Sequence, residues 1–375
     1  MIEQIPIWMW IVGFLLVLGP LVTVHELGHL LVGRWLGVKA EAFSVGFGKE
    51  LTGFTDRHGT RWRISALPLG GYVQFKGDMN PASIPDANAP AEEGAFQHAA
   101  LWRRALIVAA GPVTNILVAV AIFAVFFTII GKPTYEFPDN STQVAGFSEN
   151  SAARDAGVEI GDRIVAIDGE RVDDFYQLVD RVALYPNQDI DLLVERNGRE
   201  IALPVTIAGV TETDRFGNKG TVGRIGVYRP EDGEVKVSYE RLGVLSVLPA
   251  AVDQSMVVLD MMVTGLGQIF TGQRSVRELG GPLSIAKYSG EQLSLGWVAF
   301  INFVALISLN LAFINLLPIP MLDGGHLALY AAEAIRRKPV GPRATELAYR
   351  VGGALVLALM LFATINDVVK LLPSG

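Results

Sequence analysis

The stretch that decides the fold runs from Ile5 to Val32 and reads IPIWMWIVGFLLVLGPLVTVHELGHLLV. It is almost continuously apolar and exceeds the roughly 20 residues that a helix needs to cross the hydrocarbon core of a bilayer. A secretory signal peptide is the alternative, but the residues before it carry an acid and no base, and no small-residue cleavage site follows. The sequence therefore predicts a membrane-spanning helix here.

Three polar side chains stand inside this span, in the pattern H-E-x-x-H: His25, Glu26 and His29. Two histidines four residues apart project from one helix face, which is the spacing that one zinc ion needs. An ionisable group in mid-membrane costs about 2.5 kcal/mol or more unless it has a partner or a function, so simple helix packing is disfavoured. We predict that His25 and His29 bind zinc and that Glu26 is the catalytic base. Zinc lowers the pKa of water from about 15.7 to about 7.

A catalytic zinc site typically has three protein ligands, so one is missing from this motif. The chain contains no cysteine, which leaves histidine, aspartate and glutamate as candidates and excludes disulfides and thiol chemistry. Asp323 is favoured because Pro318 and Pro320 break the preceding helix, and irregular backbone at membrane depth is tolerated only where it is buried or lines a cavity. The following pair Gly324-Gly325 is predicted to let the chain turn tightly.

Three other residues remain as alternatives for the third ligand. His326 is the second candidate for the third ligand after Asp323. It is interpreted instead as a residue that forms a hydrogen bond nearby or faces the cytoplasmic surface. Asp367 and Asp260 are interpreted as solvated acids, the first in the outer part of the last span and the second on a polar stripe.

Further spans are predicted at residues 105–130, 295–317 and 351–372. Residues 243–270 are also apolar, but polar side chains recur on them at helical spacing, which favours a helix lying at the membrane interface. The segments after the first and third spans are rich in base: Arg34, Lys39, Lys49, Arg57, Arg61, Arg63, Lys76, Arg103 and Arg104, then Arg336, Arg337, Lys338, Arg343 and Arg350. The positive-inside rule puts both in the cytoplasm, which predicts four spans with both termini outside.

A compact β-rich domain is predicted outside the membrane at residues 143–207. Its short strands (163–167, 190–195 and 201–205) are separated by the turn signals Asp168-Gly169 and Asn197-Gly198, and helices are expected at 151–156 and 175–184. Asn-Gly between two alternating apolar runs is a strong signal for a two-residue hairpin.

The predicted fold class is thus a polytopic α-helical membrane protein with four transmembrane helices, a cytoplasmic β-hairpin region and an inserted extracytoplasmic α+β domain. The hairpins are expected from residues 41–54, 61–66 and 68–75, and a linker from Gly77 to Gly94. The predicted segments are 1–34 (first span), 35–103 (cytoplasmic region), 104–131 (second span), 138–210 (inserted domain), 211–292 (linker and amphipathic helix) and 293–375 (last two spans).

HELGH at 25–29 and LDG at 322–324 closely resemble the two metal motifs of the site-2 protease family of intramembrane zinc metalloproteases. Within this family, the sequence is most similar to the bacterial regulator-of-sigma-E type. The resemblance covers nearly the whole chain and includes GPVTN at 111–115, PLGGYV at 68–73, GPLSIAK at 281–287, and PDZ-like motifs at 150–157 and 161–169. GPVTN is interpreted mainly as helix packing that also steadies the metal helix. The best-known relatives carry two tandem PDZ domains, and this chain has room for one.

The resemblance implies a zinc-dependent endopeptidase in a bacterial inner membrane, with its active site toward the cytoplasm and its PDZ-like domain in the periplasm. Its substrates would be the transmembrane segments of single-span proteins such as anti-sigma factors, already trimmed by an upstream site-1-type protease. Asn315 would bind the unwound substrate or the developing oxyanion, and the glycine-bearing loop would pair with the substrate strand or merely cap the site.

Two other classes of function are considered. A zinc-binding PDZ scaffold or a metal carrier would need no hydrolysis, but a carrier would repeat its ligands on several spans, and a scaffold would have no need of Glu26. A nucleic-acid partner is not expected at a net charge of −7. His58 and His98 lie in the predicted cytoplasmic segments and are interpreted as ordinary surface or interface residues.

Overall fold

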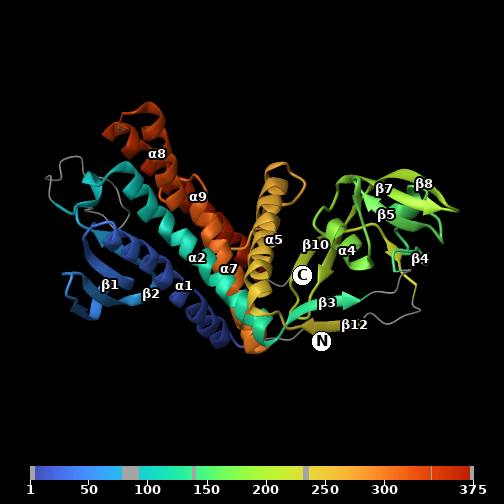
Figure 1. Ribbon diagram of the computed structural model, residues 1–375, viewed down its shortest axis with the longest axis horizontal. Coiled ribbons are helices and arrows are strands. Elements are labelled where there is room, and N and C mark those ends of the chain that lie inside the picture. The colour runs from blue at the N-terminus through green and yellow to red at the C-terminus, as the bar shows by residue number, and fades with distance from the viewer. Residues whose placement is uncertain (1–4, 78–92, 137–140, 231–235, 339, 372–375) are drawn as a thin grey trace. The chain divides into compact units, whose positions relative to one another are not determined.

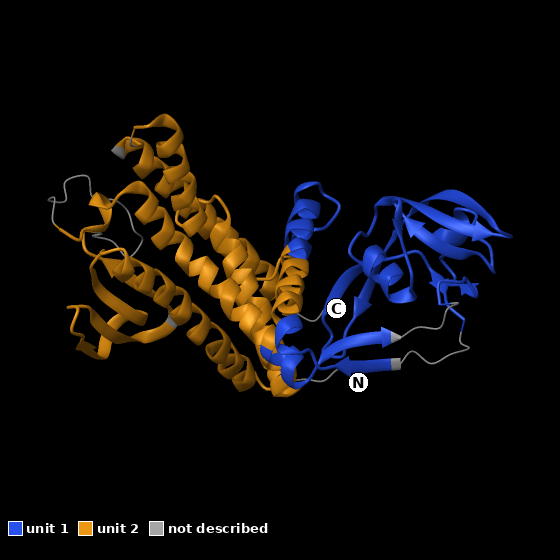
Figure 2. Cartoon of the chain, viewed as in Figure 1, with its two compact units in different colours: residues 1–4, 125–247, 260–278 blue, residues 5–124, 248–259, 279–375 orange. Residues whose placement is uncertain are grey.

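The computed structural model describes residues 5–77, 93–136, 141–230, 236–338 and 340–371 (Figure 1). The chain divides into two compact units (Figure 2), of which unit 1 comprises residues 1–4, 125–247 and 260–278, and unit 2 comprises 5–124, 248–259 and 279–375. Except at its ends, the predicted linker from Gly77 to Gly94 lies outside the described residues.

Among the described residues, five helices are long and apolar enough to cross a membrane. They are α1 (Ile7–Trp35), α2 (Leu101–Ile129), α5 (Val244–Phe270), α7 (Trp297–Leu316) and α9 (Pro342–Leu371). Four of them match the predicted spans, although α9 begins well before residue 351. The fifth, α5, is the segment that we predicted to lie at the interface. The span count and the topology therefore stay predictions.

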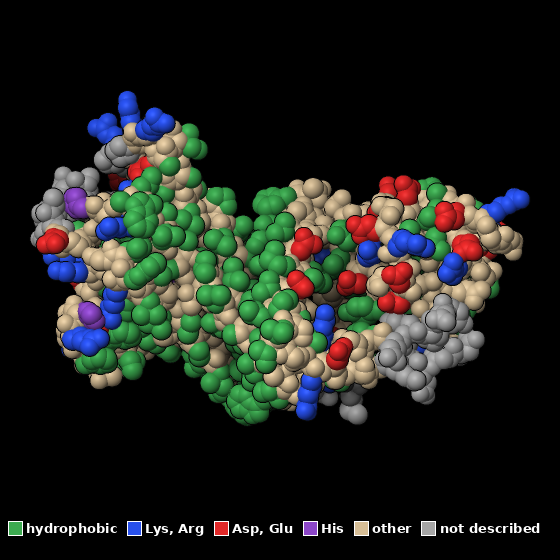
Figure 3. Space-filling model, viewed as in Figure 1, with side chains coloured by type: hydrophobic (Ala, Val, Ile, Leu, Met, Phe, Trp, Pro, Cys, Tyr) green, Lys and Arg blue, Asp and Glu red, His purple; other side chains and the backbone are tan. Residues whose placement is uncertain are grey.

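The helices of unit 2 expose their apolar side chains. Leu16 on α1 is 43% exposed, Leu117 on α2 is 61% exposed and Leu357 on α9 is 60% exposed. Hydrophobic side chains cover these helices on the face shown in Figure 3. Lys and Arg side chains gather at the end of the unit that carries α8 (Asp323–Arg336) and the hairpin of β1 (Ala40–Thr55) and β2 (Arg61–Phe75). Water-soluble proteins rarely expose such continuous apolar surface. Unit 2 is therefore built as an integral membrane protein.

Helix α6 (Pro282–Ser294) packs closely on α1 through two glycines. A Cβ on Gly13 would lie 2.7 Å from the carbonyl carbon of Ser289, and a Cβ on Gly290 would lie 2.9 Å from the backbone nitrogen of Trp10. Both glycines are needed because the two backbones touch. Val17 and Leu21 of α1 also pack with Phe300 of α7 in a buried apolar cluster.

The chain between α7 and α8 (Asp323–Arg336) does not turn where the sequence suggested. Met321 adopts a positive φ of 84°, whereas Gly324 and Gly325 lie in the first turn of α8 and are not among the residues with positive φ. A Cβ on Gly324 would stand 2.3 Å from the carbonyl oxygens of Leu316 and Leu317. The prediction that the glycine pair makes the turn is therefore wrong: it lets α8 begin directly against the end of α7. We did not predict α8.

The predicted hairpin region forms one long antiparallel pair, β1 (Ala40–Thr55) and β2 (Arg61–Phe75), followed by the short helix η1 (Phe96–His98). Phe43 and Phe75 pack with Leu30 of α1 and Ile107 of α2 in one core cluster. The hairpin is thereby fixed to the helices that carry the site.

The turn of this hairpin is tied to the end of α1. Asp56 accepts hydrogen bonds from the Arg34 guanidinium and, at 2.8 Å, from Nε1 of Trp62. Burial raises the pKa of Asp56, but the hydrogen bonds from Trp62 and Arg34 outweigh burial and hold this pKa well below its usual range. Asp56 therefore stays ionised at neutral pH and anchors the turn.

The inserted domain in unit 1 has a four-stranded antiparallel sheet in the order β6-β5-β7-β8. Its elements are α3 (Ala152–Asp155), β5 (Arg163–Ile167), β6 (Glu170–Arg171), α4 (Phe175–Ala183), β7 (Asp189–Arg196) and β8 (Arg199–Thr206). The three predicted strands and two predicted helices are confirmed. Asn197 and Gly198 both have positive φ, 51° and 75°, as a two-residue hairpin turn requires.

The core of this domain continues past residue 210. Ile225 is buried with Leu192 and Val194 of β7, and Val227 packs against them. The additional strands are β4 (Gly146–Phe147) with β11 (Val227–Tyr228), and β9 (Ala208–Thr213) with β10 (Lys219–Arg224). The two connections of the insert pair with each other as β3 (Lys132–Glu136) and β12 (Lys236–Glu240), and the short helix η2 (Val276–Glu278) follows α5.

Candidate metal centre and active site

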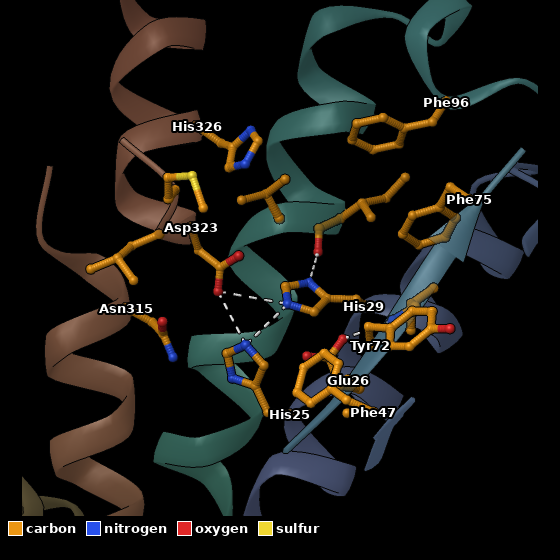
Figure 4. Close-up of a pocket in the computed structure, with 16 residues that line it drawn as sticks. His25, Glu26, His29, Phe47, Tyr72, Phe75, Phe96, Asn315, Asp323 and His326 are labelled. Atoms are coloured by element: carbon orange, nitrogen blue, oxygen red, sulfur yellow. Dashed lines mark hydrogen bonds and ion pairs between the residues drawn. The ribbon is translucent and has the colours of Figure 1, made fainter. Parts of the chain in front are cut away.

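Helices α1 and α8 bring three predicted ligands together. One carboxylate oxygen of Asp323, Oδ2, lies 3.2 Å from Nε2 of His25 and 3.6 Å from Nε2 of His29. The two Nε2 atoms are 3.1 Å apart (Figure 4). His25 and His29 project from one face of α1 because they are one helical turn apart, and Asp323 meets them because α8 starts against the end of α7.

This donor set fits a divalent metal ion. Among the described residues, His25, His29 and Asp323 form a group that could hold one, with ligand atoms all within 4.8 Å of one another. Oδ2 of Asp323 is buried and has no hydrogen-bond partner among them. A buried carboxylate oxygen that faces two imidazole nitrogens needs a proton or a metal ion between them, and a metal ion can bind all three atoms at once. Two imidazoles and a carboxylate are ligands that zinc accepts.

Helix α2 closes the site from the side and leaves space for the imidazoles. A Cβ on Gly111 would lie 2.3 Å from Nε2 of His29 and 2.7 Å from Cε1 of His25. Nδ1 of His29 lies 2.8 Å from the carbonyl oxygen of Ile107, to which it donates when it carries the ring proton. Nδ1 of His25 lies 3.3 Å from the side-chain nitrogen of Asn115. Metal-binding histidines are commonly oriented by such outer contacts.

Glu26 is held by the hairpin. Its Oε2 accepts a hydrogen bond of 3.1 Å from the backbone N–H of Val73 in β2. Figure 4 shows Glu26 beside the two imidazoles and on the side of the hairpin residue Tyr72. The carboxylate is therefore positioned next to the metal ligands without taking part in the ligand cluster.

A cavity of about 210 Å³ opens beside these residues. Asn315 of α7 lines it, as do the aromatic side chains of Phe47 and Tyr72 from the hairpin, and Met321 from the strained turn. The structure thus brings Asn315 to the same cavity as Glu26 and the three ligand candidates (Figure 4).

The alternative ligands lie in other contacts. His326 lines the cavity, but its Nδ1 lies 2.8 Å from the hydroxyl of buried Tyr349. Asp367 is 1% exposed and accepts hydrogen bonds from the backbone of Gly281 and Ser284 at the start of α6, so the interpretation as a solvated acid is wrong. Asp260 is exposed, as predicted.

Sequence reasoning missed several residues of the site. The backbone groups of Ile107 and Val73 give no signal in a sequence, because any residue supplies them. Gly111 and Asn115 belong to the motif GPVTN, for which we predicted helix packing that also steadies the metal helix, but no contact with a particular histidine. His58 and His98 are exposed, as predicted.

Apolar spanning-type helices and a histidine–carboxylate cluster with an adjacent glutamate define the class of membrane metalloproteases. A family model for peptidase family M50 matches residues 13–359. The chain therefore belongs to peptidase family M50, which confirms the resemblance to the site-2 proteases.

Three relatives carry the same name, "Putative zinc metalloprotease". The protein from Agrobacterium fabrum is 44% identical over 375 residues (97% of this chain, 96% of the relative). The one from Rhizobium meliloti is 45% identical over 362 residues (95% of each). The one from Vibrio cholerae is 30% identical over 453 residues (96% of this chain, 98% of the relative). The prediction of zinc agrees with these names.

A solved structure resembles part of the chain. The PDZ domain of an SdrC-like protein from Listeria monocytogenes matches 26% of this chain and 95% of its own length, with 16% identity and a TM-score of 0.20.

Proposed function

We propose that this protein is a zinc-dependent endopeptidase that cuts the transmembrane segments of single-span membrane proteins. The proposal rests on the convergence of His25, His29 and Asp323, with Glu26 beside them. Both histidines and Glu26 belong to α1, a helix long and apolar enough to span a membrane. Ionisable groups in such a helix are retained for function.

In this proposal, His25, His29 and Asp323 hold zinc. Zinc supplies Lewis-acid polarisation of the scissile carbonyl and lowers the pKa of water. Glu26, held by the N–H of Val73, accepts a proton from the attacking water and later passes it to the leaving amine. His326 is not assigned as a ligand, because the group of described residues whose ligand atoms lie within 4.8 Å of one another consists of His25, His29 and Asp323.

The substrate has to be unwound before it can react, because the carbonyls of a helix are occupied by internal hydrogen bonds. Asn315 lines the cavity from the opposite helix, and we assign it to binding the unwound strand or the developing oxyanion. The β1–β2 hairpin contributes Phe47 and Tyr72 to the same cavity, so a strand of substrate that pairs with the hairpin would lie next to Glu26.

The proposed setting is a bacterial inner membrane. The Lys and Arg side chains gathered near α8 and the hairpin favour a cytoplasmic position for this end of unit 2 (Figure 3). The inserted PDZ-like domain would then lie in the periplasm. We propose that it filters substrates by size, admitting proteins that an upstream site-1-type protease has trimmed, such as anti-sigma factors.

The decisive experiment compares wild-type protein with Glu26→Gln in detergent, using a panel of single-span proteins as substrates. We expect about one zinc per chain in both proteins and cleavage by the wild type only, because the substitution removes the base and no ligand. Asp323→Asn should lose zinc and His326→Ala should keep it. A wild-type protein that binds zinc and cuts nothing in the panel would favour a scaffold or carrier.

A further inference from the structure

Asn115 of α2 is a polar side chain in the interior of the helices. It is completely buried, and its backbone carbonyl accepts a hydrogen bond of 2.7 Å from Oγ of Ser308 on α7. Its side-chain Nδ2 lies 3.3 Å from Nδ1 of His25. The backbone of Asn115 is thus bonded to α7, while its side-chain amide is directed at the ring nitrogen of His25 that lies away from Asp323.

The oxygen atom of this amide makes no hydrogen bond to the described residues. This atom, Oδ1 of Asn115, is buried. A buried acceptor left unpaired costs about 1–3 kcal/mol. An apolar side chain of similar size would avoid this cost. The amide thus points to a second state of the site in which Oδ1 is used.

Metal binding by His25 creates that second state. In the arrangement seen, Nε2 of His25 faces Asp323 and can carry the ring proton, while Nδ1 accepts from Nδ2 of Asn115. When Nε2 binds a metal ion, the proton has to sit on Nδ1, which then needs an acceptor. A half-turn of the amide exchanges Nδ2 and Oδ1 with little change in shape and supplies this acceptor.

His29 differs from His25 in this respect. Its Nδ1 faces the carbonyl of Ile107, which can only accept. This carbonyl holds the proton of His29 on Nδ1 and leaves Nε2 ready for a metal at all times. Of the two histidines, His25 is the one whose ring proton has to move.

We propose that Asn115 is a positioning residue for the metal: its amide stabilises His25 in both tautomers and, by turning, fixes the tautomer that binds zinc. This inference rests on the proposed zinc site. It predicts that an acceptor at position 115 determines how tightly the full chain binds zinc.

The test measures zinc affinity by competition with a chromophoric chelator, using the full-length protein in detergent. Asn115→Leu keeps the volume and removes the acceptor, and should weaken zinc binding by about 10–100-fold. Asn115→Asp supplies an acceptor only, and should bind zinc no more weakly than the wild type. Should the aspartate variant fail to fold, Asn115→Ser supplies a hydroxyl acceptor and should bind zinc more tightly than Asn115→Leu.

Ser308→Ala is the matched control, because it removes the contact of Asn115 with α7 and leaves the amide in place. It should bind zinc as the wild type does. Unchanged affinity in Asn115→Leu, equal losses in the leucine and acceptor variants, or an equal loss in Ser308→Ala would overturn the inference.

His25→Ala separates this inference from the proposed function. If the wild type binds no zinc, or His25→Ala binds it equally well, the proposed zinc site itself is wrong. If the wild type binds one zinc, His25→Ala loses it and Asn115→Leu does not, the zinc site stands and the role of Asn115 falls.

Discussion

Adding one methyl group at Gly111 should disable the metal site without touching a ligand. The added Cβ would lie 2.3 Å from Nε2 of His29 and 2.7 Å from Cε1 of His25, whereas ordinary contact begins at 3.4 Å. The imidazole of His29 would have to retreat by about 1.1 Å. Zinc–ligand distances tolerate changes of only about 0.2 Å.

The size of the effect follows from this displacement. Moving a reacting group by about 1 Å costs about 10²-fold in rate. We expect Gly111→Ala to lose at least about 100-fold in zinc affinity and in cleavage, which corresponds to about 2.7 kcal/mol. Alanine is a better helix former than glycine, so the helix itself should not suffer.

The assay is chelator competition for zinc together with cleavage of a single-span substrate, on protein that elutes as a single folded species. Gly19→Ala in α1 is the matched control, because nothing lies within 4 Å of the Cβ it would add. It should bind zinc and cleave as the wild type does. Wild-type zinc affinity in Gly111→Ala would refute the placement of α2 against the two imidazoles.

Three further predictions concern parts outside the metal site. Asp367→Ala should lower the free energy of unfolding by about 2–3 kcal/mol in thermal denaturation, with zinc content unchanged, because it leaves the backbone donors at the start of α6 unpaired. Hydrogen bonds from Arg196 lower the pKa of Asp162 in the folded domain. The ionised carboxylate therefore stabilises the inserted domain fully above pH 3.8, which is the pKa of an unfolded aspartate. This stabilisation is lost as the pH falls from there through the lower pKa of the folded state. Hydrogen exchange of that domain in Asp162→Asn should accordingly depend less on acid pH than in the wild type. With four spans, single cysteines replacing Glu149 and Ser275 should both react with an impermeant label from outside; opposite sidedness would mean that α5 crosses the membrane.

Much of the fold could be predicted because the signals are local. A long apolar run is enough for a helix such as α1, and the spacing of His25 and His29 places both rings on one face. Asn197-Gly198 fixes a hairpin turn because both residues adopt positive φ without strain. Each of these depends on a few neighbouring residues and on no distant contact.

The parts that could not be predicted depend on residues far apart in the chain. Asp367 reads as a solvated acid near the end of an apolar helix, and only the approach of α6, more than 80 residues away, buries it. Helix α8 was missed because Pro318 and Pro320 indicate a break and give no sign that a new helix begins three residues later. Gly324 allows close packing against the end of α7, and the sequence alone does not indicate that a glycine has this role.

The motif GPVTN shows how one local pattern can carry several non-local functions. Gly111 gives the imidazoles room, and Asn115 faces Nδ1 of His25. Pro112 lies inside α2 and has no N–H, so the carbonyl of Val108, four residues earlier, lacks its helical donor. A stretch that served packing alone would need small residues but neither the proline nor a buried amide. The contacts with His25 and His29 therefore explain Gly111 and Asn115, beyond what helix packing alone requires.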